Sequence, residues 1–354
     1  MINKMEQNGL LSWVEEILAQ GSALSGVSGH EADLSGFLAD IWGVYCTESR
    51  KDVVGNQFFL KPGKSGANKI LLAAHTDEIG LIVTAVDKNG FIRFAPVGGV
   101  DARALPAQAV TVHGRSEMTG VICYAPAERR AGKPVPLTHL AVDVGYDREE
   151  VLARTRPGDI ISFAPEFQTL LNHVCAGKAL DNRAGLAALA VCLRELSGRA
   201  HAHDVIAVAT AQEEVGCRGA ATAAFQAQAA VAIAVDVTHA QSPDVKQAAQ
   251  LGKGPVIARG PNLHPLLTEY MENKARDERI PFQTEVAPRP TGTDARALQL
   301  AGAGTPTSLI SIPLRYMHTL VETVSAPDVM LTGKLLAAAV TGLSAELEEL
   351  DFAY

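Results

Sequence analysis

Long apolar runs are missing from this chain of 354 residues, although 47% of its residues are hydrophobic. A membrane-spanning helix needs a run of about 18 or more apolar residues, so a helical membrane protein is excluded and no membrane partner is expected. Clusters of Lys and Arg are missing as well, and the net charge is −8. Because nucleic acids are bound through basic surfaces, nucleic acid is not expected as a partner either.

Cysteine is scarce, and its pattern argues against a disulfide framework. The five cysteines are Cys46, Cys123, Cys175, Cys192 and Cys217. Their number is odd and no two are spaced as CxxC, which favours reduced thiols. The first twenty residues contain Glu6, Glu15 and Glu16 within an amphipathic pattern, which predicts a helix and not a signal peptide. We therefore expect a cytoplasmic protein.

The order of apolar segments predicts two domains. Strand-length apolar runs alternate with helical segments up to about residue 82 and again after about residue 173. Such alternation indicates an α/β fold with a mostly parallel central sheet and helices on both faces. Residues 83–172 consist mainly of short alternating segments separated by Gly and Pro, which predict an inserted all-β domain, a small barrel or sandwich. The main domain would then comprise residues 1–82 and 173–354.

One predicted helix start carries a local signature. The segment Ser28-Gly29-His30-Glu31 has the form of a capping box, which stabilises the first turn of a helix. Ser28 would be the N-cap and Glu31 would lie at the third helical position. We therefore expect His30 to be a polar residue of the first turn and not a ligand.

Two adjacent acids, Glu213 and Glu214, follow the apolar run 204–210, which predicts a buried parallel strand. In open α/β sheets, ligands bind outside the carboxyl ends of the strands, so chemistry is expected at this point. Neighbouring buried acids are tolerated when a cation binds or when a pKa rises, so one could ligate a metal while the other acts as a base. The alternative is a first helical turn, where acids are favoured without any binding role.

Further imidazoles and carboxylates follow other predicted strands. The residues at strand ends or in the loops after them are His75, Asp77, Asp181, Glu213, Glu214, Asp236, Asp294 and His318. Mixed imidazole and carboxylate ligands suit zinc, cobalt or manganese, and this set has more carboxylates than one tetrahedral ion needs. Two metal ions that share a bridging carboxylate would account for the number of carboxylates. Such a pair can activate a water molecule and stabilise a developing oxyanion.

Six motifs carry a resemblance to a known family. They are HTDEIG from His75, KALDNRAG from Lys178, QEEVGCRGA from Gln212, DVTHA from Asp236, TGTDA from Thr291 and IPLRYMHTLVE from Ile312. In this order and at this spacing, they resemble the motifs of the M42 family of dinuclear metallo-aminopeptidases, which includes glutamyl and deblocking aminopeptidases and the tetrahedral TET peptidases. The resemblance covers nearly the whole chain, including the β-rich insertion.

The resemblance implies a metal-binding role for five residues. His75 and Asp236 would bind the first ion. Glu214 and His318 would bind the second, and Asp181 would bridge both. It therefore implies two divalent ions per subunit, with zinc as the expected metal and cobalt or manganese as alternatives.

The resemblance also implies the catalytic groups. Glu213, free of the metals, would be the general base that takes a proton from the bridging water and passes it to the leaving amine. Asp77 would orient His75 through its second ring nitrogen. The peptide bond after Asp181 could be cis. The implied reaction is hydrolysis of the N-terminal peptide bond of peptides with a free N-terminus.

The resemblance implies a homo-oligomer, from a dimer to a tetrahedral dodecamer, with the β-rich insertion in the dimer contacts. The chain departs from the family pattern at three positions. Asn182 stands where the family often has Asp, Leu320 stands where a Pro is frequent, and Arg296 replaces a smaller residue. If Arg296 faces the substrate it would favour acidic N-terminal residues, and otherwise it is an exposed helical arginine.

Other functions remain open from the residues. A deacetylase, amidase or carboxypeptidase could use the same dinuclear scaffold. A glycosidase could use Glu213 with Asp77 as its two carboxylates, but it would not need the histidines. A non-catalytic protein could keep the metals for stability, but it would not need an unliganded Glu213.

Overall fold

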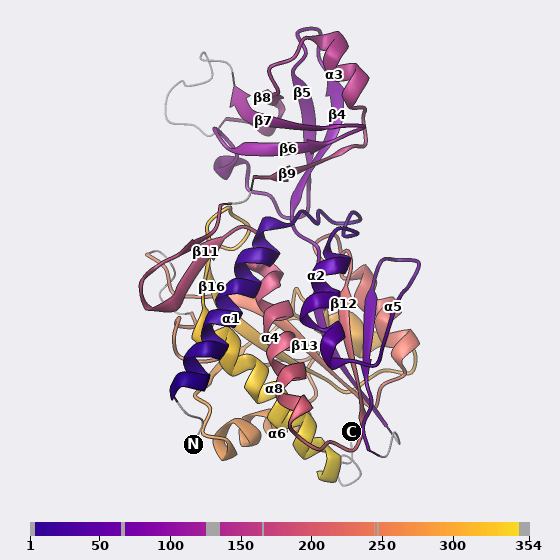
Figure 1. Ribbon diagram of the computed structural model, residues 1–354, viewed down its shortest axis with the longest axis vertical. Coiled ribbons are helices and arrows are strands. Elements are labelled where there is room, and N and C mark those ends of the chain that lie inside the picture. The colour runs from indigo at the N-terminus through magenta and orange to yellow at the C-terminus, as the bar shows by residue number, and fades with distance from the viewer. Residues whose placement is uncertain are drawn as a thin grey trace.

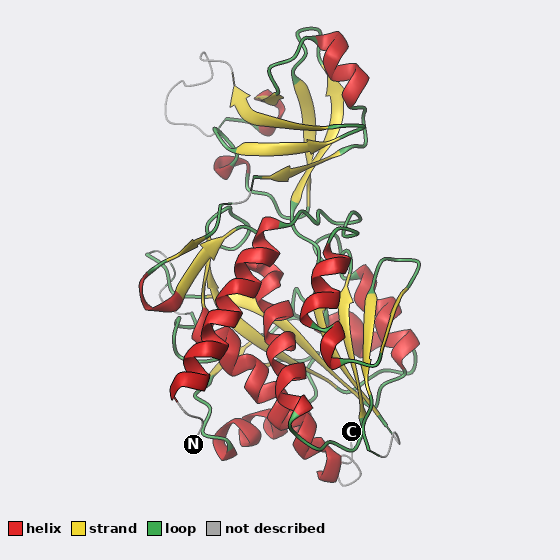
Figure 2. Ribbon diagram, in the orientation of Figure 1, coloured by secondary structure: helices red, strands yellow, loops and turns green. Residues whose placement is uncertain are grey.

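The structure is a computed structural model that describes residues 4–64, 68–124, 135–164, 166–243, 245 and 248–346. It consists of a large α/β domain and a smaller β-barrel that stands at one end of it (Figures 1 and 2). The barrel strands all lie between Gly80 and Phe163, whereas the strands of the large sheet come before and after them. The predicted α/β fold with an inserted all-β domain is therefore confirmed, and the insertion is a barrel.

Four parallel strands form the centre of the large sheet. In spatial order they are β12 (Asp204–Thr210), β3 (Lys69–His75), β13 (Val231–His239) and β16 (Thr307–Arg315). Their side chains are buried along almost their whole length, as expected for strands covered on both faces. The carboxyl ends of these strands therefore meet at one edge of the sheet.

Antiparallel strands flank the parallel centre, so the sheet is mixed. They are β1 (Glu48–Lys51) and β2 (Gln57–Lys61) on one side, and β17 (Glu322–Ser325), β11 (Val174–Gly177) and β10 (Gln168–Thr169) on the other. Short connections explain the pairs β1–β2, β10–β11 and β16–β17, because a few residues can join antiparallel neighbours. The antiparallel pairs β2–β12 and β11–β17 join strands that are far apart in the sequence. A further pair, β14 (Val256–Arg259) and β15 (Gln283–Val286), joins the sheet through β16.

Helices cover both faces of the sheet. One face packs against α1 (Lys4–Ala23), α2 (Leu34–Ile41), α4 (Leu180–Ser197), α6 (Pro265–Asp277) and α8 (Ala326–Glu346). The other face packs against the shorter helices α5 (Arg218–Ala227) and α7 (Ala295–Leu300). Adjacent residues of β3 serve opposite faces, since Leu72 belongs to the first core and Leu71 to the second. None of the helices in the described ranges is long and apolar enough to cross a membrane.

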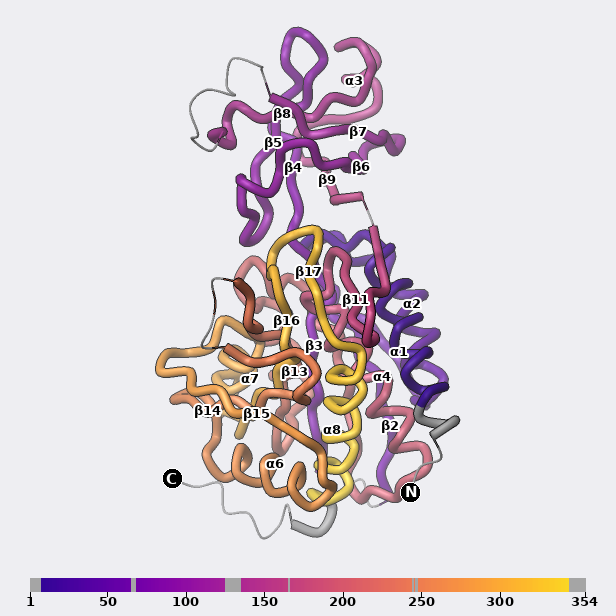
Figure 3. The backbone as a smooth tube through the Cα atoms, turned by 90° about the vertical axis from the view of Figure 1, so that its left-hand side faces the viewer, coloured from indigo at the N-terminus to yellow at the C-terminus, as the bar shows by residue number. Residues whose placement is uncertain are grey.

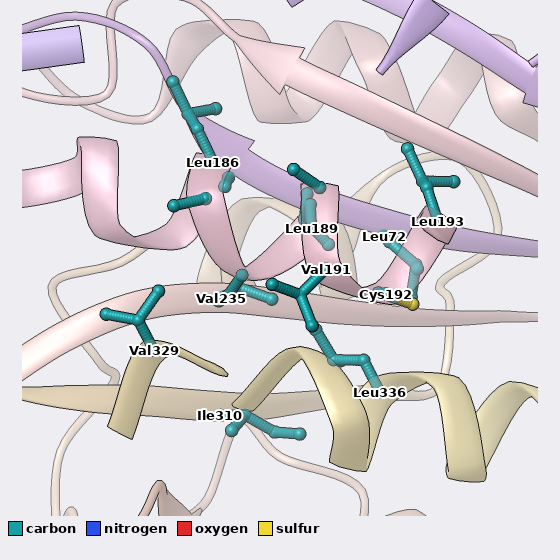
Figure 4. Close-up of a cluster of buried hydrophobic side chains, with 14 of the residues drawn as sticks. Leu72, Leu186, Leu189, Val191, Cys192, Leu193, Val235, Ile310, Val329 and Leu336 are labelled. Atoms are coloured by element: carbon teal, nitrogen blue, oxygen red, sulfur yellow. The ribbon is translucent and has the colours of Figure 1, made fainter. Parts of the chain in front are cut away.

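The central helix α4 is enclosed between the sheet and α8. Every residue of α4 from Leu180 to Leu193 is buried. Figure 4 shows Leu186 and Leu189 of this helix among side chains of the sheet and of α8. A Cβ at Gly333 of α8 would lie only 2.4 Å from the carbonyl oxygen of Ala188, so the two helices approach closely at this glycine. The enclosed position of α4 therefore explains why this helix is apolar on all its sides.

The barrel has its own hydrophobic core. Its strands close in the order β4 (Gly80–Val86), β5 (Ile92–Val97), β8 (Leu140–Asp143), β7 (Glu117–Tyr124), β6 (Ala109–His113) and β9 (Ile160–Phe163). The helix α3 (Arg148–Arg154) starts at a capping box of Asp147 and Glu150. Single 3₁₀ turns lie at Gly43–Tyr45, Ala102–Ala104, Leu137–His139 and Leu171–His173. Because β3 ends at His75 and β4 begins at Gly80, the chain passes directly from the carboxyl edge of the sheet into the barrel.

We expect the substitution Leu189→Ala to lower the free energy of unfolding by about 2–5 kcal/mol, because it leaves a cavity between α4 and its neighbours. Leu189 is fully buried. The control is Leu300→Ala, at a side chain that is 77% exposed, where we expect a change within about 0.5 kcal/mol. Urea unfolding of the metal-depleted protein measures both. Equal losses in the two variants would contradict the enclosed position of α4.

Candidate metal centre

The structure brings all seven predicted site residues together at the carboxyl edge of the sheet. Three segments follow or end the parallel strands: His75 ends β3, Glu213 and Glu214 follow β12, and Asp236 lies near the end of β13. Asp181 lies at the start of α4, His318 in the loop between β16 and β17, and Asp77 in the loop after β3. In Figure 3 the β16–β17 loop lies at the end of the α/β domain that faces the barrel.

Two imidazoles stand on either side of the Asp181 carboxylate. Asp181 Oδ1 lies 3.0 Å from His75 Nε2, and Asp181 Oδ2 lies 3.5 Å from His318 Nε2. Asp236 Oδ1 lies 3.6 Å from His75 Nε2, and Glu214 Oε1 lies 3.3 Å from His318 Nε2. Among the described residues, two groups of three candidate ligands share Asp181, which lies with His75 and Asp236 in one and with Glu214 and His318 in the other. Glu213 belongs to two further groups, one with His75 and Glu214 and one with Cys217 and Asp294.

The cluster has an excess of buried carboxylates. Burial raises the pKa of Glu214 and of Asp236, and the neighbouring charge of Asp181 adds to both shifts. Hydrogen bonds with Asp181 and then Glu214 raise the pKa of His318 to about 11, which means that the carboxylates stabilise a positive charge between them. Burial raises the pKa of Asp181, but its contacts with the two histidines outweigh burial, so the net shift is downward. Such a set fits divalent cations, which would supply the missing positive charge.

Glu213 is placed differently from the other acids. Its side chain lines the cavity, and its Oε1 accepts a hydrogen bond from the thiol of Cys217 at 3.2 Å. Burial is the main cause that raises the pKa of Glu213 to about 9, and the charges of Asp236 and Asp294 contribute. Asp294 itself is buried and accepts a hydrogen bond from the hydroxyl of Thr210. Glu213 is therefore a carboxyl group that can carry a proton near neutral pH.

Asp77 lies behind the cluster and holds the acidic pair in place. Its Oδ1 accepts a hydrogen bond from the backbone N–H of Glu213 at 2.9 Å, and its Oδ2 accepts one from that of Glu214 at 3.0 Å. His75 Nδ1 is closer to the backbone oxygen of Asp77, at 3.1 Å, than to its carboxylate, at 3.5 Å. The loop of Asp77 therefore orients both His75 and the two glutamates.

The predicted capping box is wrong. Helix α2 begins only at Leu34, after Asp33 as N-cap. The Ser28 hydroxyl instead donates to Asp77 Oδ2 at 2.6 Å, and Glu31 Oε1 accepts from the backbone N–H of Gln212 at 3.1 Å. The side chains of Ser28 and Glu31 bond to residues that are distant in the sequence instead of capping a helix. The spacing of residues along the sequence carries no information about such distant partners.

Asn182 connects α4 to the strand that carries Asp236. Its Nδ2 donates to the carbonyl of Val235 at 2.8 Å, and its Oδ1 accepts from the N–H of Gly185 at 2.9 Å. An aspartate at this position could accept from Gly185 but could not donate to Val235. The peptide bond between Asp181 and Asn182 is cis.

Two buried cations lie behind the carboxylates, and the sequence analysis did not single them out. Lys178 Nζ donates to both oxygens of Glu78, at 2.9 and 2.7 Å. Arg183 is fully buried and donates to the backbone oxygens of Gly21 and Thr76. Both residues belong to the KALDNRAG motif. Their positive charges within this motif could have indicated from the sequence that they lie near the carboxylates. They offset part of the negative charge of the centre.

A cavity of about 610 Å³ opens from the cluster. Its wall contains six of the seven residues, all except Asp77, and also Thr238, Glu285, Arg289 and Arg296. The hydroxyl of Thr238 donates to Glu285 Oε2 at 2.7 Å. Arg296 is exposed and also lines the cavity. It is therefore both an exposed helical arginine and a residue that faces the space where a substrate would bind.

Comparison with known proteins identifies the family. The family model of the M42 glutamyl aminopeptidases matches residues 55–335. This chain belongs to the M42 family. A lysyl aminopeptidase from Pyrococcus furiosus is 39% identical to it over 338 residues, which cover 92% of this chain and 95% of that relative. The protein is accordingly a metallo-aminopeptidase, a hydrolase.

Solved structures share the fold of this chain. A TET1 peptidase from Pyrococcus horikoshii, described as able to assemble into a tetrahedron or a large octahedral shell, is 31% identical with a TM-score of 0.82. The match covers 92% of this chain and 99% of that one. A structure described as an endoglucanase from Thermotoga maritima is 30% identical with a TM-score of 0.76, covering 92% and 96%.

The barrel of this M42 aminopeptidase reaches the centre through Gly99. His318 Nδ1 lies 3.1 Å from the backbone oxygen of Gly99, so a proton on Nδ1 would leave Nε2 free to face Asp181 and Glu214. A Cβ at Gly99 would lie 2.5 Å from His318 Nδ1. The inserted domain therefore helps to orient one imidazole of the cluster.

We expect Gly99→Ala to weaken binding of a divalent metal by about 10-fold or more, because the added methyl displaces the His318 ring. Gly36→Ala is the control, since a Cβ there meets nothing within 4 Å. Titration of the metal-depleted protein with Zn²⁺ measures the affinity of both variants. Unchanged affinity in Gly99→Ala would show that the barrel does not constrain His318.

Proposed function

We propose that this M42 aminopeptidase removes residues from peptides with a free N-terminus at a centre of two divalent metal ions. The observation that carries the proposal is the Asp181 carboxylate, with one oxygen beside each of two imidazoles. A single ion would need only one of the two groups of donor atoms, whereas a shared carboxylate between two groups suits a pair of ions.

In this proposal His75 and Asp236 would hold one ion, Glu214 and His318 would hold the other, and Asp181 would serve both. Imidazole nitrogen and carboxylate oxygen are ligands of zinc, and cobalt or manganese would accept the same set. When bound, the ions would supply Lewis acidity that polarises a peptide carbonyl and lowers the pKa of a water molecule.

Glu213 is proposed as the general base. Its backbone is held by Asp77 and its carboxyl group faces the cavity, where the thiol of Cys217 contacts it. A carboxylate at this position would take a proton from the attacking water and deliver it to the leaving amine. The positive charge of bound ions would lower the raised pKa of Glu213, so that the carboxyl group would be ionised to accept the proton and could then deliver it.

Selection of a free N-terminus follows from the charge of the site. The free α-amine of the substrate would lie near the ions and the acidic groups of the cavity, and an N-acetyl group would remove both its charge and its basicity. Asp77 does not fit the alternative role of a second glycosidase carboxylate, because it is fully buried and its two oxygens accept hydrogen bonds from Glu213, Glu214 and Ser28. A glycosidase needs two carboxylates that flank the substrate.

We expect chelator treatment to abolish hydrolysis of a panel of aminoacyl-p-nitroanilides, and Zn²⁺, Co²⁺ or Mn²⁺ to restore it. Glu213→Gln should lower kcat by about 10²–10⁴-fold while it still binds metal, because only proton transfer is removed. Glu149→Gln, an exposed glutamate of α3, is the matched control and should retain wild-type activity. Rates for the free and the N-acetylated substrates are compared.

Cleavage of the N-acetylated substrates alone would overturn the aminopeptidase proposal in favour of a deacylase or amidase. A melting temperature that depends on metal, with no hydrolysis under any condition, would favour a non-catalytic metal protein. Full activity in Glu213→Gln would remove this residue from the role of base.

We also propose that the chain forms a homo-oligomer, up to a tetrahedral dodecamer, in which the barrel contributes to dimer contacts. The support is the similarity to the TET1 peptidase and the exposed apolar side chains of the barrel, among them Val121 and Tyr146. Light scattering of the purified protein should give a mass of twelve subunits, and Val121→Asp should shift it toward smaller species. A monomer at all protein concentrations would contradict the proposal.

A further inference from the structure

Glu322 contacts two of the proposed metal-binding segments at once. It is the first residue of β17 and is only 2% exposed. Its Oε1 accepts a hydrogen bond from the backbone N–H of His318 at 2.7 Å. Its Oε2 accepts one from the backbone N–H of Asp181 at 2.9 Å. A single carboxylate therefore joins two residues that lie far apart in the sequence.

The N–H of Asp181 needs an acceptor because it lies at the start of a helix. The first N–H groups of a helix have no partner within it. At the start of α4 the backbone of Asp181 and Asn182 is not helical, with ψ values of 99° and 42°. Glu322 supplies the acceptor that regular helical structure cannot, and in doing so it places the carboxylate proposed to bridge the ions.

His318 is less buried than the other imidazole of the cluster. Its side chain is 30% exposed, whereas that of His75 is 2% exposed. Its loop contains two non-glycine residues in the left-handed region, Tyr316 and His318, each with a φ of 60°. Such a backbone persists only where surrounding contacts enforce it. The hydrogen bond from its N–H to Glu322 is one of those contacts.

The sheet explains why Glu322 reaches both segments. β17 pairs with β11, and Glu322 lies opposite Gly177, directly before the turn that leads into Asp181. β17 also pairs with β16, whose end leads into the loop of His318. Burial and then the charge of Asp181 raise the pKa of Glu322 well above its usual range, although the hydrogen bonds from the N–H groups of Asp181 and His318 oppose this shift.

We propose that Glu322 is a positioning residue that fixes Asp181 and His318 relative to each other, so that the affinity of the centre for metal depends on it. The inference rests on the proposed dinuclear centre. Glu322 itself binds no ion in this proposal, and it acts only through the two backbone N–H groups. Without Glu322, the distance between the imidazole of His318 and the carboxylate of Asp181 would no longer be fixed.

The test is metal binding by Glu322→Gln. Glutamine has almost the same shape, but its NH₂ group would face one of the two N–H donors and leave it without an acceptor. We expect the metal-depleted variant to bind Co²⁺ about 10–100-fold more weakly than the wild type, the range found for residues that support metal ligands. Calorimetric titration gives stoichiometry and affinity, and the visible spectrum of Co²⁺ reports its coordination.

The matched control is Glu272→Gln. Glu272 is also a buried glutamate with two charged partners, but those are Arg259 and Arg276, away from the metal ligands. It should lose folding stability without losing Co²⁺ affinity. Glu322→Asp is a second variant in case glutamine impairs folding, because its shorter side chain keeps the charge but cannot span both donors, and it too should bind Co²⁺ more weakly.

Three further outcomes are decisive. If the wild type binds two equivalents of Co²⁺, His318→Ala loses one, and Glu322→Gln binds like the wild type, the metal centre stands and the role of Glu322 is overturned. A variant with a lower melting temperature but unchanged Co²⁺ affinity and spectrum would also overturn it, since its role would be structural only. A wild type that binds no divalent metal would overturn the proposed centre and this inference with it.

Discussion

Mutual repulsion among buried carboxylates at one edge of the sheet is the constraint on which this structure depends. Asp181, Glu213, Glu214 and Asp236 lie within reach of two imidazoles, and the net pKa shift, caused mainly by burial, is upward for three of these four acids. A protein cannot keep such a group together without compensating charge. The imidazoles, the cations behind the cluster and the inferred metal ions provide that charge, so the site is a product of charge balance as much as of shape.

The residues that support the cluster are not among its proposed metal ligands. The loop of Asp77 holds the N–H groups of the acidic pair, and Glu322 holds those of Asp181 and His318. Gly99 of the barrel faces the second nitrogen of His318. The supporting groups therefore come from the sheet, from its loops and from the inserted domain. Such partners set the orientation of a ligand and so its affinity for metal.

Local patterns predicted the parts of the fold that local physics controls. Apolar runs of strand length became the parallel centre of the sheet, because strands covered on both faces must be apolar throughout. Polar residues after those runs came together, because parallel strands end at a common edge. The capping box at Ser28 and Glu31 failed, since both side chains bond to residues distant in the sequence. Periodicity likewise could not show that the sheet becomes antiparallel on both sides.

The sequence by itself determined the fold class, the family and the residue types at the site, because strand patterns and ordered motifs are properties of the chain alone. Only the tertiary structure decided which atoms meet: that Asp181 offers one oxygen to each imidazole, that Asp77 holds the backbone of the acidic pair, and that Glu322 bonds two segments. A hydrogen bond forms only when its donor and acceptor lie within a few tenths of an ångström of about 2.9 Å, and these groups are far apart in the chain. Spacing along a sequence contains no such distances.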